Sequence, residues 1–544
     1  MIDSSVVNRT WDVIIIGAGA AGAAAALGLR DKHVIMLDVG ISPPPNPLPD
    51  SPLYALRESQ RDLHSVLLGE QFESLAPIRG EEISPKLKAP FIRYLSKRPR
   101  GFPVDEEVGF KSVQSFAIGG LANAWGAGVL RYNDADLKGF PFGSSELAPL
   151  YDELTDHIGI SGSSGDDLTE YLGSTYGLLP PTQLSPIMES LLGRYEKRRS
   201  KLHAQGVRIG RTRAAILTRP FRARKPFRAF GQDFMWGPQE SIYSPLFTIR
   251  ELISAGHLNY QANVRVSRFE ERNDFVVVHA QNLANGHSVE VKGSRIILAA
   301  GALNTARIAL TSANDTATKL PLLDNAVTFV PVIDPFKIGT PLQTDSYIGG
   351  ELLMVAPGER PERPIQGSIY GLLGPLRTDL LREFPLSIRG NLAASRYLVP
   401  ALMMVQLFYP DDPSPQSTLR LKSDGGLNIV RAGRLVRNRE RDICRTLRGL
   451  GYVALEQLCV RPSPGSSIHY AGTLPMSMNP QSQYSTDQNG RLETTTRVYV
   501  ADAATFPSLP AKNHTFTLMA NALRIGKHVG QTLSEPTTTI ASTR

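Results

Sequence analysis

Three glycines near the start of the sequence, Gly17, Gly19 and Gly22, follow the spacing G-x-G-x-x-G, and Asp38 lies 21 residues after the first of them. This arrangement has the chemistry of a dinucleotide site. The first glycine permits a tight turn, the second lets the backbone approach a pyrophosphate, and the third lets a helix pack closely on a strand. A carboxylate at about this distance can accept hydrogen bonds from a ribose.

The surrounding sequence supplies the elements that would position these groups. Residues 13–16 are β-branched, which favours a strand buried on both faces. Residues 20–29 predict a helix, and Ala20 and Ala21 would form its first turn, where backbone N–H groups hold phosphates. Residues 34–37 predict a second strand that ends at the acidic residue. A lone glycine motif is weak, but the complete strand, turn, helix, strand and acid unit is specific.

One alternative treats the apolar residues 13–29 as a signal peptide or a membrane span. The segment is short for a span, is rich in Gly and Ala, and is followed by a predicted strand instead of a cleavage site. No other uninterrupted apolar stretch is long enough to cross a bilayer. The dinucleotide interpretation is therefore favoured, and we expect no membrane span.

Length and composition are those of a globular enzyme with two or three structural units. The chain has 544 residues, of which 42% are hydrophobic and 20% are charged. Its two cysteines, Cys444 and Cys459, match no metal-ligand spacing and indicate no disulfide framework. We therefore expect no metal site and a reducing, cytoplasmic location.

The net charge of +8 is unevenly distributed. Residues 194–228, here called the basic window, contain 13 Lys or Arg and a single acid, Glu196. A solvated basic face is the commoner explanation of such a cluster. The functional alternative is a binding surface for an anionic substrate or an acidic carrier protein. The window contains no recognised nucleic-acid-binding motif, so we expect no nucleic-acid partner.

Strands of the nucleotide-binding type recur along the chain. Besides residues 13–16, buried strands are predicted at residues 295–300 and 497–501. Between them, antiparallel strands are predicted at 258–269, 275–281, 288–292, 325–333, 401–409 and 417–430, the last three in a second sheet. The pattern predicts an α/β protein in which a discontinuous Rossmann-type domain is interrupted by an α+β substrate domain built on an antiparallel sheet.

Four parts of the sequence coincide with the motifs of one family. They are GAGAAG at Gly17 with Asp38, AIGGLANAWGAGV from Ala117, RIILAAGALNTARIAL from Arg295, and a C-terminal pair formed by SIHYAGTLPM from Ser467 and RVYVADAATFPSLPAKNHTFTLMANALRIG from Arg497. The chain resembles the glucose-methanol-choline (GMC) oxidoreductases, which are FAD-dependent alcohol oxidases and dehydrogenases. The resemblance implies FAD as cofactor and a small-molecule alcohol as substrate.

The resemblance also implies a division into five segments. We expect the FAD-binding domain at residues 1–135, 207–315 and 462–544, and the substrate domain at residues 136–206 and 316–461. The two glycine-rich segments would hold the pyrophosphate and lie along the flavin, Val264 would meet the adenine, and Asp502 would meet the pyrophosphate or the isoalloxazine. The expected FAD contacts are Gly17, Gly19, Ala20, Ala21, Gly22, Asp38, Gly119, Gly120, Asn123, Ala124, Trp125, Gly126, Val264, Ala300, Gly301, Asp502, Ala503 and Thr515.

Two residues occupy the positions of the family's catalytic pair. His469, in H-x-x-G-T, stands where the family keeps its catalytic histidine, and Asn513, in N-x-T-x-T, stands where a His or Asn partner belongs. This combination resembles cholesterol oxidase and pyranose 2-oxidase. His514 is the rival for the second role, and in the preferred alignment it points away. Some family members link a histidine just before Trp125 to the flavin; here that residue is Ala124, so we expect non-covalent FAD.

Alcohol oxidation requires removal of the hydroxyl proton and transfer of a hydride to flavin N5. A neutral His469 would serve as the base, and Asn513 would orient the same hydroxyl and stabilise the charge that develops on its oxygen. The expected reaction is oxidation of a secondary alcohol to a ketone in a polar cyclic substrate such as a sugar, glycoside or cyclitol.

Several alternatives stay open on the sequence. The substrate could be a lipophilic or steroid alcohol, and the GMC fold also hosts hydroxynitrile lyases and a light-driven fatty-acid decarboxylase. Escort proteins keep a similar glycine fingerprint without an active flavin. Locally, His469 could be hydrogen-bonded in a turn, and Asn513 could cap the last helix.

Overall fold

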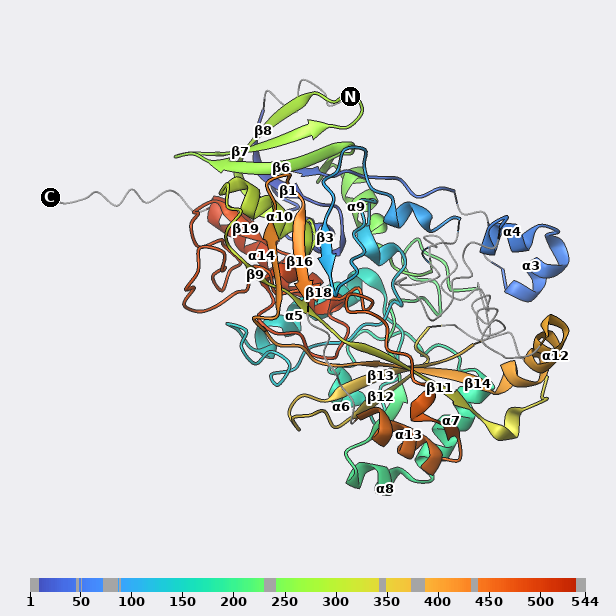
Figure 1. Ribbon diagram of the computed structural model, residues 1–544. Coiled ribbons are helices and arrows are strands. Elements are labelled where there is room, and N and C mark those ends of the chain that lie inside the picture. The colour runs from blue at the N-terminus through green and yellow to red at the C-terminus, as the bar shows by residue number, and fades with distance from the viewer. Residues whose placement is uncertain are drawn as a thin grey trace.

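The computed structural model describes residues 9–45, 48–49, 51–71, 87, 90–228, 241–341, 349–372, 387–431 and 439–534. Residues 1–8 and 535–544, the ends of the predicted FAD-binding segments, lie outside this range. Two large sheets dominate the described part and lie at opposite ends of the molecule (Figure 1). The predicted fold class, a Rossmann-type domain with a second domain on an antiparallel sheet, is confirmed.

The first sheet has the strand order β5-β2-β1-β8-β7-β6, with β19 beside β8. Its strands are β1 (Thr10–Ile16), β2 (Val34–Leu37), β5 (Asn259–Gln261), β6 (Val264–Glu271), β7 (Val276–Asn282), β8 (Ser288–Leu298) and β19 (Val498–Val500). Strands β5, β2, β1, β8 and β19 run parallel, whereas β6, β7 and β8 form an antiparallel meander. The two strands predicted at 288–292 and 295–300 are a single strand, β8, which belongs to both parts.

The strand and helix predicted around the first glycine motif are present. In β1, Val13 and Ile15 pack into one hydrophobic core and Ile14 and Ile16 into another, so the strand is buried on both faces. Helix α2 (Ala20–Leu27) follows, packed against the long helix α14 (Thr515–Ser534). Residues 13–29 are therefore a strand, a turn and a helix, not one membrane span. Of the helices that the structure describes, none is long and apolar enough to cross a membrane.

The second sheet has six strands in the order β17-β11-β14-β13-β12-β4, and every neighbouring pair is antiparallel. They are β4 (Arg208–Arg211), β11 (Val327–Ile333), β12 (Leu352–Ala356), β13 (Ile365–Gly371), β14 (Leu402–Phe408) and β17 (Val453–Ala454). Helices α7 (Pro186–Glu196), α8 (Arg199–Ala204) and α13 (Arg439–Gly449) cover one face of this sheet (Figure 1).

Successive side chains of this sheet point to opposite faces. The helix-covered face is apolar, and it is formed by Leu352, Met354, Ile365, Ile369, Met403, Val405 and Leu407. The opposite face contributes Leu353, Ser368, Tyr370, Gln406 and Phe408 to a cavity beside the first sheet. The sheet is therefore a platform with one structural face and one face available for a ligand.

Two details differ from the sequence prediction. Residues 417–430 were expected in the second sheet, but β15 (Ser417–Leu421) and β16 (Leu427–Arg431) form a separate sheet with β3 (Glu106–Val108) and β9 (Leu320–Pro321). Strand β4 pairs with β12, although the predicted division assigns residues 207–315 to the FAD-binding domain. The sheet to which a strand belongs is hard to assign from sequence because its partners are distant in the chain, as β3 is from β16 and β12 is from β4.

Short elements connect these sheets. The remaining helices and strands are α3 (Leu53–Ser59), α4 (Leu63–Leu68), α5 (Ser144–Ile158), α6 (Thr169–Leu172), α9 (Pro245–Ser254), α10 (Ala302–Ser312), α12 (Ile388–Leu398), the 3₁₀ helices η2 (Arg93–Ser96), η3 (Gly120–Asn123), η4 (Pro335–Lys337), η5 (Val399–Ala401), η6 (Glu456–Leu458) and η7 (Ala503–Thr505), and the strands β10 (Leu323–Asp324) and β18 (Tyr470–Ala471).

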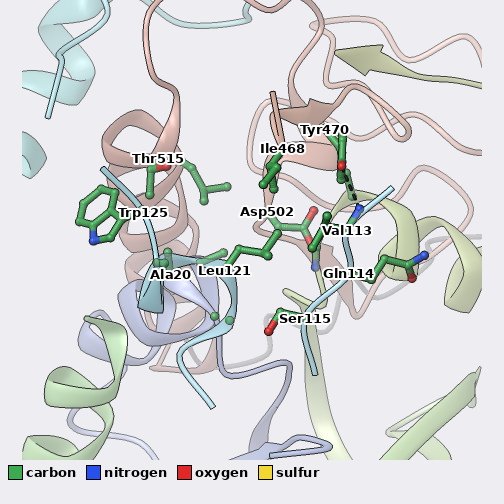
Figure 2. Close-up of a pocket in the computed structure, with 18 of the residues that line it drawn as sticks. Ala20, Val113, Gln114, Ser115, Leu121, Trp125, Ile468, Tyr470, Asp502 and Thr515 are labelled. Carbon is green, nitrogen blue, oxygen red and sulfur yellow. Dashed lines mark hydrogen bonds between the residues drawn. The ribbon is translucent and has the colours of Figure 1, made fainter. Parts of the chain in front are cut away.

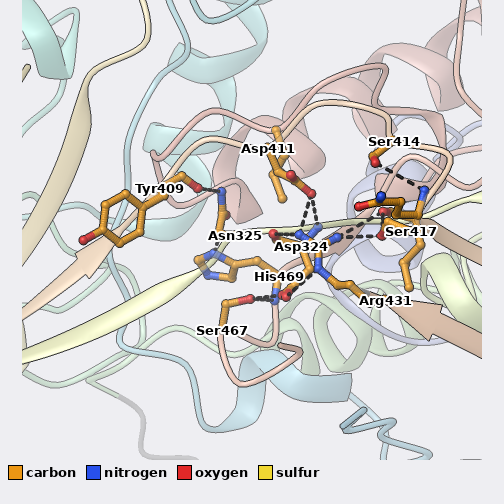
Figure 3. A network of polar contacts seen from close by, with 12 residues as sticks. Asp324, Asn325, Tyr409, Asp411, Ser414, Ser417, Arg431, Ser467 and His469 are labelled. Carbon is orange, nitrogen blue, oxygen red and sulfur yellow. Dashed lines mark hydrogen bonds and ion pairs between the residues drawn. The ribbon is translucent and has the colours of Figure 1, made fainter. Parts of the chain in front are cut away.

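A buried ion network joins β10 to the four-stranded sheet of β3, β16, β15 and β9, here called the small sheet (Figure 3). Arg431 donates from Nη2 to Asp411 at 2.9 Å, and its Nε lies 3.7 Å from a carboxylate oxygen of Asp324. Asp324 also accepts hydrogen bonds from Ser467 Oγ at 2.5 Å and from the backbone N–H of Gly465 at 2.8 Å. Burial nevertheless raises the pKa of Asp324 to about 6. The network thus fixes the chain just before His469.

Replacing Arg431 by Met should lower the free energy of unfolding by about 3–5 kcal/mol, because two buried carboxylates lose their cation. The loss should be larger at pH 8 than at pH 5, because protonation of Asp324 removes one of the uncompensated charges. Chemical denaturation of the purified protein measures it, with the exposed neighbour Arg420→Met as matched control. Equal stability of the two variants would contradict this account.

Candidate active site

A cavity lies between the carboxyl ends of the parallel strands and the open face of the six-stranded sheet. Figure 2 shows it between Ala20 at the start of α2 and the loop through Val113 and Ser115, with Leu121 and Ile468 directed toward the same space. Ligands of open α/β sheets bind at this edge of the strands. The cavity is therefore the candidate active site.

One half of the cavity is lined by backbone. Gly17 has a φ of +106°, which favours glycine, and a Cβ on Gly19 or Gly301 would meet no atom within 4 Å. Helix α2 directs its first N–H groups to the same place. Asp38 follows β2, lines the cavity and accepts a hydrogen bond from the hydroxyl of Tyr260 at 3.3 Å. These features fit a dinucleotide with its pyrophosphate at the turn and a ribose at the carboxylate.

Most of the expected cofactor residues line this cavity. They are Gly17, Gly19, Ala20, Ala21, Asp38, Gly120, Ala124, Trp125, Gly126, Val264, Ala300, Gly301, Asp502, Ala503 and Thr515. The expected catalytic residues His469 and Asn513 line it as well. The structure thus brings together residues from five separate motifs.

Three expected cofactor residues, Gly22, Gly119 and Asn123, do not line the cavity. A Cβ on Gly22 would lie 2.0 Å from the carbonyl oxygen of Gly17, so this glycine permits strand–helix packing. Gly119 supports a turn with a φ of +90°, and its missing Cβ leaves room for the amide of Asn123. That amide is 5% exposed and is occupied by the carbonyl of Ile118 and the hydroxyl of Ser244. Asn123 therefore stabilises the second glycine-rich segment through internal hydrogen bonds and does not face the cavity.

Asp502 lines the cavity, but its carboxylate is already bonded within the protein. It accepts hydrogen bonds from the backbone N–H groups of Gly301 and Ala504, at 2.8 and 2.9 Å, and from Thr305 Oγ1 at 2.5 Å. Burial raises its pKa to about 6. The side chain therefore fixes the turn after β19 against the N-terminus of α10.

His469 lies in the loop before β18, and its ring is held on three sides. Nδ1 is 2.9 Å from Oδ1 of Asn325, the ring of Phe408 stacks on it at a centroid distance of 5.2 Å, and His514 meets it edge-on at 4.8 Å. Burial and the neighbouring His514 hold the pKa of His469 well below its ordinary value. The imidazole is therefore neutral at pH 7 and is suited to accept a proton.

The loop before α14 supplies the other two polar groups. Asn513 accepts a hydrogen bond at Oδ1 from Nε2 of Gln366 at 2.9 Å, which leaves its Nδ2 hydrogens for other acceptors. The expectation that His514 points away is wrong, since its ring contacts His469 and lines the cavity. Burial lowers the pKa of His514 to about 4. The site thus combines two neutral imidazoles and one carboxamide.

The backbone next to His469 is strained. Ile468 has a φ of +61°, a conformation that β-branched residues rarely adopt. It is held there by the bonds that Asp324 makes to Ser467 and Gly465 on the same loop. Strain of this kind persists where the surroundings determine a functional geometry.

Sequence reasoning missed Asn325, Gln366 and Phe408, which hold the catalytic candidates in place. Gln366 and Phe408 belong to strands β13 and β14 of the second sheet, and Asn325 follows β10; none of the three lies in a family motif. The available signal was the alternation of Gln366, Ser368 and Tyr370 with apolar residues, which puts polar groups on one face of a buried strand.

The basic window contributes only Thr212 to the described cavity lining. Several of its arginines are used internally. Arg194 donates to both carboxylate oxygens of Asp334 at 2.9 Å, and Arg213 donates to the carbonyls of Leu172 and Ser174. These internal contacts account for much of the positive charge of the basic window, so a binding partner is not needed to explain it.

Comparison with known proteins gives one family-model match and one structural match of use here. Residues 422–522 match the family model described as GMC oxidoreductase, which represents the C-terminal domain. Among solved structures, pyridoxine 4-oxidase from Mesorbium loti has a TM-score of 0.60 and 15% identity, over 95% of this chain and 99% of that chain. Residues 422–522 are thus similar to the C-terminal domain of GMC oxidoreductases, and the chain as a whole is similar in fold to pyridoxine 4-oxidase. A comparison with curated proteins gave no match.

GMC oxidoreductases are flavoproteins, and the glycine-lined half of the cavity fits the FAD that they bind. The turn at Gly17 and Gly19 would hold its pyrophosphate, and Asp38 would hold its adenosine ribose. Among the described residues, no group of three or more His, Cys, Asp or Glu side chains is arranged to hold a metal ion.

Gly19→Val should weaken FAD binding by at least roughly tenfold, about 1.4 kcal/mol, because the side chain enters the space that the pyrophosphate requires. Titration of apoprotein with FAD, followed by fluorescence, measures this. The control is Gly165→Val, which also faces open space but lies on an exposed loop away from the cavity. Unchanged affinity in the Gly19 variant would show that the pyrophosphate lies elsewhere.

Proposed function

We propose that this protein is a GMC oxidoreductase that uses non-covalent FAD to oxidise a secondary alcohol to a ketone on a neutral, polar, cyclic substrate such as a sugar, glycoside or cyclitol. The observation that carries the proposal is that His469, Asn513 and the glycine-lined half of the pocket border one cavity. Burial, which lowers the pKa of His469, favours the neutral imidazole that a base requires. Ala124, where some family members carry a flavin-linked histidine, supports non-covalent binding.

Each residue of the site has a distinct task in this reaction. Bound FAD supplies the hydride acceptor. Nε2 of His469 takes the hydroxyl proton, since Nδ1 is bonded to Asn325. Nδ2 of Asn513 donates to the same hydroxyl oxygen, because its Oδ1 is occupied by Gln366, and so orients the alcohol and stabilises the developing negative charge.

The cavity wall opposite the glycine-lined half supports a neutral, polar substrate. It presents hydroxyl and amide groups from Thr212, Ser368, Tyr370 and Gln406 beside the aromatic ring of Phe408. In the part of the chain that the structure describes, no charged side chain of the six-stranded sheet reaches this wall. Such a lining suits a ring with several hydroxyl groups better than an anion or a steroid.

The basic window does not enter this proposal, because the arginines described above already have internal partners. An acidic carrier protein would have to dock on the remaining side chains. A cytoplasmic location is proposed because Cys444 and Cys459 are both free thiols.

Anaerobic mixing with a panel of alcohols tests the reaction, and sugars, glycosides and cyclitols should bleach the flavin faster than sterols, aryl alcohols or pyridoxine. His469→Ala should slow flavin reduction by about 10² to 10⁴-fold while FAD stays bound. His514→Phe, which keeps a ring against His469, is the matched control and should lose less than about tenfold. Reduction at the parental rate in the His469 variant would remove its catalytic role.

The rate of flavin reduction should depend little on pH between roughly pH 6 and 8. The base acts in its neutral form, and burial moves the pKa of His469 below its ordinary value, so the acid limb of the profile is displaced to lower pH. Stopped-flow measurements across this range provide the check. An acid limb centred near pH 7 would contradict it.

A further inference from the structure

We propose that Asn325 is a positioning residue that fixes His469 in the tautomer with hydrogen on Nδ1, and so presents an unprotonated Nε2 to the substrate. The inference rests on the proposed role of His469 as base. Nothing in the sequence motifs marks Asn325, which follows strand β10 in the substrate domain.

Strand pairing brings the two side chains together. Strands β10 and β18 are antiparallel, with Leu323 opposite Ala471 and Asp324 opposite Tyr470. The next pair in the same register is Asn325 and His469. Their contact, 2.9 Å between Oδ1 and Nδ1, is therefore a consequence of the backbone register (Figure 3).

The amide of Asn325 can face His469 in only one orientation. Its Nδ2 donates to the backbone carbonyls of Tyr409 at 2.8 Å and Pro510 at 3.0 Å, so both amide hydrogens meet oxygens that can only accept. The atom toward the imidazole is then Oδ1, which is also an acceptor. The hydrogen of this contact must therefore belong to Nδ1 of His469, and a neutral ring has its lone pair on Nε2.

Among the residues that the structure describes around His469, no other group competes for this role. His514 meets the ring edge-on with a pKa lowered by burial, and Phe408 covers one ring face. The carboxylate of Asp324 is taken up by Ser467, Gly465 and the nearby Arg431. An amide at Nδ1 orients the imidazole without the charge that would stabilise its protonated form.

The same amide links the two catalytic loops. Pro510 precedes Asn513 on the loop that leads into α14, and Asn325 is 1% exposed between this loop and that of His469. The buried side chain of Asn325 thus sets the tautomer of His469 and also binds the loop that carries Asn513.

The direct test needs no substrate. Protein labelled with ¹⁵N-histidine is studied by two-bond ¹H–¹⁵N correlation NMR, and the His469 signals are identified by their loss in His469→Ala. At pH 7 we expect a protonated Nδ1 and an unprotonated Nε2. The opposite tautomer, or a mixture of both, would overturn the proposal.

Asn325→Asp provides the second test. A carboxylate still accepts from Nδ1 but stabilises the imidazolium, so the pKa of His469 should rise by at least one unit by NMR. The acid limb of flavin reduction, measured with the best alcohol of the panel, should move by the same amount. A variant that is less stable or binds less FAD but keeps the parental pKa would show that Asn325 is only structural.

A double-variant cycle separates this inference from the proposed function. If Asn325 acts through His469, Asn325→Asp should change the reduction rate much less in the His469→Ala background than in the parent. Equal changes of the rate in both backgrounds would overturn the inference about Asn325 and leave the proposed function standing. A parental rate in His469→Ala by itself would overturn the proposed function, while the NMR tautomer would still be measurable.

Discussion

The pairing of β10 with β18 is the constraint on which the site depends. It joins a strand that leads into the substrate domain to the strand that returns to the FAD-binding domain, and it is only two residues long on each side. Its stability comes from outside the pair, because Asp324 is bonded to the loop of His469 and to Arg431 of the small sheet. A network with several charge-assisted bonds can hold a loop that contains a strained residue such as Ile468.

Burial sets the protonation state of the two histidines in the site. Taking an imidazole out of water disfavours its charged form, so both histidines are neutral. In the described part of the six-stranded sheet, the polar groups that face the cavity are uncharged. Phe408 adds an apolar cover to one of the two rings. A base that is neutral over a wide pH range, beside a neutral wall, suits removal of a proton from an uncharged hydroxyl group.

The sequence predicted the parts that depend on local pattern. The unit from Gly17 to Asp38 is a continuous strand, turn, helix and strand, so its glycine spacing and its β-branched residues identified both the fold and the glycine-lined half of the cavity. The site residues beyond this unit were assigned from family motifs, and most of them line one cavity. Asn123 does not line the cavity. The motif shows where an amide occurs, but it does not show that Ile118 and Ser244 are bonded to that amide.

The parts that could not be predicted depend on pairing between distant segments. Asn325 and His469 are 144 residues apart in the chain and meet through strand register, which a single sequence does not reveal. The orientation of His514 depends on how the loop before α14 enters the helix, and the preferred alignment had it reversed. Strand β8 was divided in two because its ends have different surroundings, an exposed meander and a buried parallel sheet.

The central claim is that His469 and Asn513 hold the same substrate oxygen. A crystal structure of the FAD-loaded enzyme with the best alcohol of the panel, or with an inert analogue, tests it most directly. We predict that the reacting oxygen lies at about 2.6–3.2 Å from both Nε2 of His469 and Nδ2 of Asn513. An oxygen that contacts neither atom, or a His469 ring directed away from the flavin, would contradict the account.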